Sequence, residues 1–298
     1  MAASAVASGL VVVDKPAGMT SHDVVARLRR LLRTRRIGHA GTLDPMATGV
    51  LVCGVGRATK LLGHLALDTK AYLATVRLGA ATSTDDAEGE PVRSADASEI
   101  GQAVVRARLA ALSGDIEQVP SAVSAVKVGG RRAYELARAG EQVTLPARAV
   151  TVSRLDLLEL RRGERVTDLD VAVECSSGTY VRALARDLGE ALGVGGHLVA
   201  LRRTRVGQFD LTTARSLDEL AADPALSLDL DAAVFAAFGA RSIGAEEAVR
   251  LSHGGRVPAV GMAGTHAAID PDGHAVALLS EQGGVARPVL VLRPAGGS

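Results

Sequence analysis

Apolar residues near the start of the chain follow first a strand-like and then a helical pattern. Residues 9–16 form an apolar run that ends at Pro16, which predicts a buried strand followed by a turn. Thr20 or Ser21 can cap the next helix, with Asp23 close to the capping-box position. The apolar positions of this helix share one face: Val24, Val25, Leu28, Leu31 and Leu32.

The middle of the chain alternates between predicted strands and helices. Strands are expected at 50–55, 70–79 and 122–128, with a hairpin at 150–160 and 166–175. Helices are expected at 58–67, 100–112, 131–139 and 180–192. These elements predict a mixed α/β (α+β) fold, in which a mainly antiparallel sheet carries flanking helices.

Past residue 210 the pattern changes, because glycine and proline interrupt the chain at short intervals. Helices are expected at 217–228 and 245–251, followed by short strands around 257, 266–269, 276–279 and 289–292. We therefore predict a large domain at 1–228 and a small β-rich C-terminal domain at 229–298.

Composition supports a folded protein with an uneven charge distribution. Of 298 residues, 47% are hydrophobic but only 2% are aromatic, so the core must consist of Ala, Val and Leu. Residues 1–80 hold eleven Lys and Arg against four Asp and Glu, whereas 210–298 hold six against eleven. A localised basic region indicates a polyanionic partner, nucleic acid first. For Arg29, Arg30 and Arg33 alone, a solvated helix face explains the charge better.

Several classes of protein are disfavoured by the sequence. Cys53 and Cys175 lie far apart in apolar runs, as expected of buried free thiols in a reducing compartment. No Cys and His cluster has zinc spacing, no apolar run could span a bilayer, and the N-terminus lacks the charged region of a signal peptide. We expect a cytoplasmic protein. The acidic residues 83–98 are expected to form a surface loop.

The segment 35–49 concentrates chemically useful residues. It contains Asp44 followed by Pro45, together with His39, Arg35 and Arg36, and several glycines that allow close backbone approach. Asp before Pro is common in ordinary turns, so Asp44 could serve a local purpose. The neighbouring basic residues favour a second interpretation, in which Asp44 is a functional carboxylate on a rigid loop.

A second candidate lies at the start of the helix at 180–192. Arg182 falls in the first turn, where acidic residues are preferred, so a specific anionic partner would explain it. The alternative is an ordinary surface or structural ion pair.

Taken together, these motifs resemble the TruB family of bacterial tRNA pseudouridine synthases, which act on the T-loop uridine. The resemblance covers nearly all of 9–207 and depends on motifs that occur in the family order: 13–21, 38–49, 56–60, 70–72, 177–182 and 197–204. One departure is visible at 120–127, where the family usually has Pro-Pro and a Met or aromatic residue. The family commonly ends in a PUA-type module, although the tail of this chain is acidic.

The resemblance implies a role for each candidate. Asp44 would be the nucleophile or charge stabiliser, and Arg182 would pair with it and keep it ionised. Tyr72 would stack on the target base and could move a proton. Tyr180 and Leu201 would line the uracil pocket, and His39 would enter the RNA loop. Without the resemblance, Tyr72, Tyr180 and Leu201 are equally well explained as core residues and His39 as a loop residue.

Basic residues would contact the RNA backbone and position it. The candidates are Lys15, Arg35, Arg36, Arg57, Lys60, Arg202, Arg203 and Arg205. Because the isomerisation involves no redox change and loses no atom, no cofactor or metal is expected. The expected partner is the tRNA T-stem-loop, bound by a monomer with no obligate protein partner and no membrane association.

Two other functions are compatible with the residues. A non-catalytic RNA-binding or tRNA-folding protein would use the same basic residues without needing Asp44. A small-molecule glycosidase would use Asp44 as one of two carboxylates, but no second acid stands out in the motifs.

Overall fold

The computed structural model describes residues 8–121, 127–128, 131–132 and 145–296. Most of the strand expected at 122–128 and of the helix expected at 131–139 lies outside these residues. The described part corrects the helix, because Lys127–Val128 and Arg131–Arg132 pair as the antiparallel strands β8 and β9. By its contacts the chain divides into two compact units. The first comprises Met1–Asp44, Val50–Ala66 and Gly207–Ser298, and the second comprises Pro45–Gly49 and Leu67–Val206.

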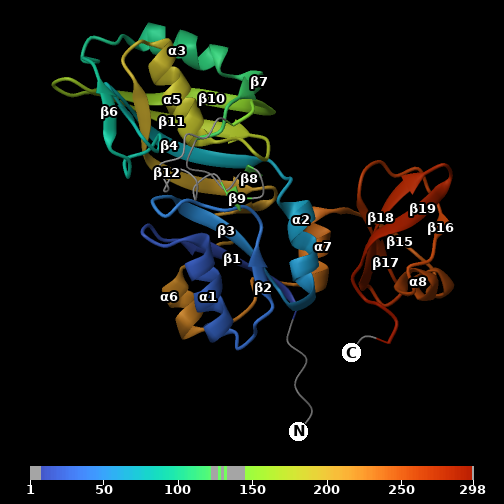
Figure 1. Cartoon of the computed structure of the whole chain (residues 1–298). Helices are drawn as coiled ribbons and strands as arrows, with labels where there is room; N and C mark the ends of the chain where they lie inside the picture. The colour runs from blue at the N-terminus through green and yellow to red at the C-terminus, as the bar shows by residue number, and fades with distance from the viewer. Residues whose placement is uncertain (1–7, 122–126, 129–130, 133–144, 297–298) are drawn as a thin grey trace. The chain divides into compact units, whose positions relative to one another are not determined.

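The first unit contains both ends of the chain (Figure 1). Its N-terminal elements are β1 (Gly9–Lys15), α1 (Ser21–Leu31), β2 (Ile37–His39), β3 (Thr48–Val55), the 3-10 helix η1 (Gly56–Leu61) and α2 (Leu62–Leu65). Its later elements are β13 (Phe209–Asp210), α6 (Leu217–Ala222), β14 (Leu228–Asp229), α7 (Leu230–Ala237), β15 (Gly239–Ser242), α8 (Ala245–Ser252), β16 (Val257–Pro258), β17 (His266–Ile269), β18 (Ala275–Gln282) and β19 (Val285–Val291).

Helix α1 forms as the sequence predicts. Thr20 is its N-cap and makes a complete capping box with Asp23. The buried face of the helix, Val24, Val25 and Leu28, packs in one apolar cluster with side chains of β1, β3 and α6. The expected buried strand is confirmed as β1, in which Gly9 is followed by four buried residues with apolar side chains, 10–13.

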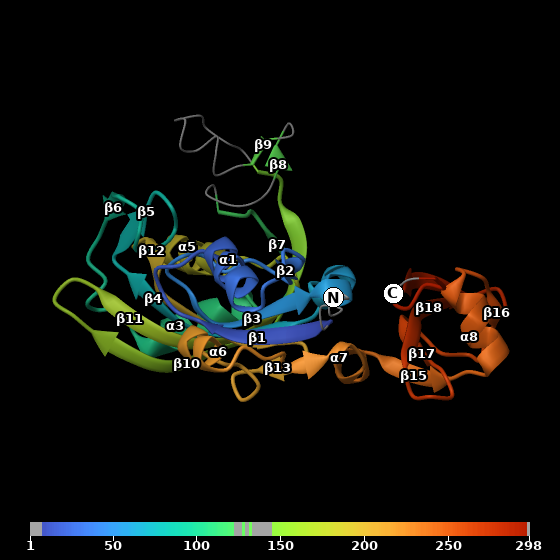
Figure 2. The same cartoon turned by 90° about the horizontal axis from the view of Figure 1, so that it is seen from below.

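The C-terminal part of this unit is a small β-rich module, as expected. Five strands follow the order β15-β17-β18-β19-β16, and α8 contacts β16, β18 and β19 (Figure 1). Figure 2 shows the same module from below. The module has its own apolar cluster, which includes Leu251 of α8 and Leu279 of β18.

The second unit is a five-stranded antiparallel arrangement in the order β12-β4-β11-β10-β7. Its elements are β4 (Lys70–Leu78), β5 (Ala80–Thr82), β6 (Pro91–Ser94), α3 (Gln102–Ala111), β7 (Gly114–Gln118), β10 (Arg148–Arg162), β11 (Thr167–Cys175), α5 (Val181–Ala191) and β12 (Gly196–Val206). Helices α3 and α5 pack on one face, where α3 contacts β10 and α5 contacts β12 and β4 (Figure 1). The expected mixed, mainly antiparallel fold is confirmed.

Strand β12 is the main element that the sequence pattern does not reveal. No strand is expected from the sequence directly after the helix at 180–192, yet β12 runs for eleven residues from Gly196. Helix α5 comes so close to this strand that a Cβ on Gly189 would lie 2.0 Å from the backbone nitrogen of Gly196. A glycine is therefore required at 189 for α5 to pack where it does.

Candidate active site

The part of the loop that precedes and includes Asp44 belongs to the first unit and is anchored there. Strand β2 pairs with β3 in antiparallel register, with His39 opposite Cys53. The residue before Asp44 is fixed by the buried Ser21 hydroxyl, which accepts a hydrogen bond from Leu43 N at 2.8 Å and lies 3.1 Å from Leu43 O. This double contact makes Asp44, which is partly exposed, a carboxylate on an anchored loop. The sequence pattern indicates Ser21 only as a possible N-cap of the first helix, not as an anchor for Leu43.

His39 lies at the base of the same loop. Its ring meets the ring of His22 edge to face, with centroids 5.6 Å apart. The partly exposed imidazole is thus oriented by a neighbour on α1.

The end of the motif, Thr48–Gly49, belongs to the second unit and pairs with β12. Thr48 is in parallel register with Arg202 and Gly49 with Arg203. Gly49 has φ of 101°, and a Cβ at this position would lie 2.1 Å from the carbonyl oxygen of Arg203. Only glycine can bring this part of the motif against β12.

On its other side, β12 pairs with β4, which brings two more candidates together. Ala74 lies opposite Leu201 and Tyr72 opposite Arg203. Because directly opposed residues point to the same face of a sheet, Tyr72 and Leu201 share a face. Both side chains are largely buried, at 8% exposure each.

Arg182 is buried at the start of α5. Its exposure is 5%, and one of its terminal nitrogens donates to Thr84 O at 3.0 Å and lies 3.4 Å from a carboxylate oxygen of Asp86. Asp86 is itself 3% exposed and accepts hydrogen bonds from Glu88 N and the Thr84 hydroxyl. The guanidinium is therefore held by a buried carboxylate that sequence reasoning missed.

The position of Asp86 corrects the expectation of a surface loop at 83–98. Strand β6 in this segment is exposed, but Asp86 forms a bridge to Leu198 of β12, with Leu198 N bonded to Asp85 O and Ala87 N bonded to Leu198 O. The acidic composition suggested solvent, and no feature of the sequence distinguishes Asp86 from its neighbours. Burial also raises the pKa of the Asp85 carboxyl, a rise that the nearby Arg186 opposes.

The eight basic candidates differ in accessibility. Arg35, Arg36 and Lys60 are exposed, and Arg57, Arg202 and Arg205 are partly exposed. Lys15 and Arg203 are buried, at 0% and 1% exposure, which makes them the least accessible to phosphate. The Lys15 ammonium donates to the carbonyls of Pro16 and Met19 at 2.9 and 2.6 Å.

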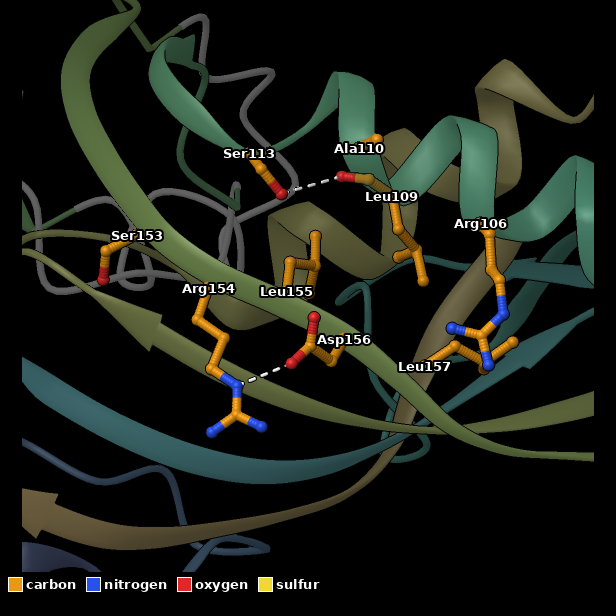
Figure 3. Close-up of a pocket in the computed structure, with 9 residues that line it drawn as sticks. All are labelled: Arg106, Leu109, Ala110, Ser113, Ser153, Arg154, Leu155, Asp156 and Leu157. Carbon is orange, nitrogen blue, oxygen red and sulfur yellow. Dashed lines mark hydrogen bonds and ion pairs between the residues drawn. The ribbon is translucent and has the colours of Figure 1, made fainter.

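Two pockets lie on the second unit. One, of about 470 Å³, is lined by residues of β4, β10, β11 and β12 together with Met46 and Thr48, and it includes Leu201. The other, of about 360 Å³, lies between α3 and β10 and contains none of the predicted site residues (Figure 3). Its Arg154 side chain donates to Asp156 at 2.6 Å. The first pocket is thus the one associated with the predicted site.

Within the second unit, the structure collects Tyr72, Leu201 and Arg182 around β12 and the start of α5. Asp44 and His39 belong to the first unit, so the pairing of Asp44 with Arg182 stays a prediction. Both cysteines are free and buried, as expected. Among the described residues, no helix combines the length and apolar character needed to cross a membrane.

Two solved structures of complexes that contain Cbf5 share this fold. The structure of a Cbf5-Nop10-Gar1 complex matches with a TM-score of 0.74 at 26% identity, covering 97% of this chain and 86% of that one. An archaeal box H/ACA sRNP Nop10-Cbf5 complex matches with a TM-score of 0.73 at 25% identity, covering 98% and 88%.

Comparison with family models and curated proteins gives the family. The model of the TruB family pseudouridylate synthase N-terminal domain matches residues 29–181. Residues 182–232 match a tRNA pseudouridylate synthase B C-terminal domain, and 238–293 match a tRNA pseudouridine synthase II C-terminal domain. The tRNA pseudouridine synthase B of Nocardia farcinica is 64% identical over 97% of this chain and 94% of its own length. That of Mycobacterium tuberculosis is 58% identical over 98% of both.

The chain therefore belongs to the TruB family of pseudouridylate synthases. As a member of this family it is a tRNA pseudouridine synthase, which is an isomerase.

Proposed function

We propose that the enzyme isomerises the T-loop uridine at position 55 of tRNA, with Asp44 as its catalytic carboxylate. The reaction breaks the C1′–N1 bond and joins C1′ to C5 of the same uracil. A proton leaves C5 and N1 gains one, so atoms and electrons balance without a cofactor.

The observation that carries the proposal is the role of Arg203 in the sheet. This residue is in register with Gly49 on one side and with Tyr72 on the other. Gly49 follows Asp44 by five residues, so the chain itself limits how far the carboxylate can be from Tyr72. The anchoring of Leu43 by Ser21 supports a fixed direction for the carboxylate.

Arg182 would hold Asp44 ionised and directed at the sugar. A guanidinium presents several donors in a planar fork and can serve more than one carboxylate. The contacts with Asp86 and Thr84 O would keep it in place before RNA binds. Tyr72 would stack on the uracil and handle its proton, while Tyr180 and Leu201 would line the pocket in which the detached base turns.

RNA would be positioned through its phosphates by the more accessible basic residues, namely Arg35, Arg36, Arg57, Lys60, Arg202 and Arg205. The target uridine must leave its stack, and His39 would occupy the space it vacates. We further propose that the enzyme acts as a cytoplasmic monomer and that its C-terminal module is PUA-like.

The test uses Asp44→Asn with an unmodified tRNA transcript. Tritium release from C5-labelled uridine should fall by at least about 1,000-fold, because a group that bonds to the substrate or bears its charge is lost. Carbodiimide mapping should locate the wild-type product at position 55. Asp218→Asn, which changes a carboxylate whose side chain is 94% exposed, is the matched control. Wild-type turnover by the Asp44 variant would overturn the catalytic assignment, and product at another position would overturn the T-loop assignment.

A further inference from the structure

Gln118 makes an unusual contact with the backbone of Tyr180. It is the last residue of β7 and only 2% exposed. Its Oε1 accepts from Tyr180 N at 2.8 Å, and its Nε2 donates to Tyr180 O at 3.1 Å. The side-chain amide thus binds the backbone as a neighbouring strand would, although the two residues are 62 positions apart.

The chemistry of this contact suits an amide. Tyr180 presents a donor and an acceptor on the same residue, and the planar amide of Gln carries a matching acceptor and donor side by side at neutral pH. An ionised carboxylate would satisfy the N–H but would face the carbonyl oxygen with a second acceptor.

The contact occurs at the position where α5 begins. Tyr180 is the N-cap residue, it has no side-chain cap bond, and its carbonyl accepts the first intrahelical bond from Leu184 N at 3.2 Å. Gln118 therefore fixes the peptide groups on both sides of Tyr180. Arg182 lies two residues further, in the first turn.

A second contact links the same strand end to α5. Arg186 donates to Val119 O at 2.8 Å, and its other terminal nitrogen lies 3.3 Å from a carboxylate oxygen of Asp85. The end of β7 is thus attached to α5 at two places, by Gln118 at the N-cap residue Tyr180 and by Val119 at Arg186. Gln118 makes the attachment that is nearer to Arg182 along the helix.

We propose that Gln118 is a positioning residue for pseudouridine formation, which sets the orientation of Tyr180 and Arg182 by holding the first turn of α5. The inference rests on the roles proposed above for these two residues. Gln118 itself touches neither uracil nor sugar. Its loss lets the first turn fray, and an error of about 1 Å in the position of a catalytic group lowers turnover by roughly 100-fold.

The first test is Gln118→Met, which keeps the length of the side chain and removes both hydrogen bonds. Single-turnover pseudouridine formation should slow about 10- to 100-fold, with tRNA affinity nearly unchanged because phosphate contacts are untouched. The control is Thr167→Val, which removes a buried side-chain hydrogen bond to Ala97 O of 2.7 Å at the far end of β11. If both variants melt lower but turn over equally well, Gln118 is structural only and the proposal fails.

The second test is Gln118→Glu, whose activity should depend on pH. Below its pKa the neutral acid supplies an acceptor for Tyr180 N and a donor for Tyr180 O, as the amide does. Above it the carboxylate repels the carbonyl oxygen. The ratio of wild-type to variant rate should therefore shrink as pH falls, and a ratio independent of pH would contradict the inference. This variant also serves if Gln118→Met does not fold.

A double-mutant cycle with Arg182→Lys separates this inference from the proposed function. If Gln118 acts through the first turn of α5, the two rate losses combine to less than their product. If the two rate losses are independent, or if Arg182→Lys has a large effect and Gln118→Met has none, the inference about Gln118 is wrong while the proposed function still stands. If Arg182→Lys turns over like wild type, the role proposed for Arg182 is wrong.

Discussion

Two buried arginines, one in each unit, show how similar chemistry can serve different purposes. Arg182 and Arg241 are 5% and 8% exposed, and each contacts a carboxylate whose side chain is little exposed, Asp86 at 4% and Glu281 at 8%. In both cases the carboxylate also accepts backbone N–H bonds from a loop. A buried ion pair of this kind is therefore no evidence for a catalytic site by itself.

The difference lies in what surrounds each arginine. Glu281 gathers the backbone N–H groups of three successive residues, Val260, Gly261 and Met262, at 2.7–3.1 Å. Arg241 completes this cluster by donating to Pro258 O at 2.9 Å, so the assembly closes a loop within the C-terminal module. Arg182, by contrast, lies in the first turn of the helix that Tyr180 caps. The comparison teaches that position on the fold, more than burial or charge, is the reason to propose a functional role for Arg182 and not for Arg241.

Among the changes that test this comparison, the largest effect is expected for Arg182→Lys. A lysine keeps the charge but lacks the planar fork, so turnover should fall by about 100-fold or more while tRNA affinity changes little. Single-turnover kinetics and filter binding measure the two quantities. Equal losses in both would indicate that Arg182 mainly binds phosphate.

Asp86→Asn should affect both activity and stability. Breaking a buried pair removes a carboxylate from the buried guanidinium, which costs about 3–5 kcal/mol of unfolding free energy. Turnover of the folded variant should fall about 10-fold, because Arg182 loses its contact with Asp86 and is held less firmly. Urea unfolding and single-turnover rates provide the measurements. A folded variant with unchanged turnover would show that Asp86 serves the fold alone.

Glu281→Gln should change stability without changing turnover. Backbone hydrogen bonds, that of Val260 first, hold the pKa of Glu281 below its ordinary value of 4.5. A carboxyl with a lowered pKa in the folded protein stabilises it above the ordinary pKa, and this contribution disappears as pH falls through the lowered value. Melting temperatures between pH 6 and 3 should therefore converge for wild type and variant. A constant difference at all pH values would contradict this account.

The smallest effect is expected for Asp168→Asn on the sheet of the second unit. Asp168 binds Arg77 with two hydrogen bonds of 2.7 and 2.8 Å, but the arginine side chain is 38% exposed. Solvent screening limits such a pair to about 1 kcal/mol or less. Urea unfolding should show this small loss of unfolding free energy, and turnover should be normal. A loss as large as that of Asp86→Asn would remove the distinction between exposed and buried ion pairs.

The elements that the sequence predicts well depend on local pattern. Helix α1 follows from Thr20, Asp23 and its apolar face, and β4 from the alternation that begins at Tyr72. Strand β12 could not be predicted because its pattern is irregular. Two register shifts against β4 interrupt the alternation, and Arg203 faces the interior.

The candidate site shows the same limit. Asp44, Tyr72 and Arg182 stand out through motifs that resemble a family, so sequence alone could nominate them. Asp86 and Gln118 could not be nominated, because their partners lie far away along the chain. Asp86 contacts Arg182, 96 positions further on, and Gln118 contacts Tyr180, 62 positions further on. Only the fold brings those groups together.

Helix α7 determines where an isolated C-terminal fragment should begin. Its Asp231 accepts two hydrogen bonds from Arg293 at 2.8 and 2.9 Å and one from Ala275 N at 2.8 Å. A C-terminal fragment that starts at residue 238, where the last family match begins, would lose this carboxylate. One that starts at Asp229 would retain it, together with the N-cap of the helix, and is the better choice for studying the module in isolation.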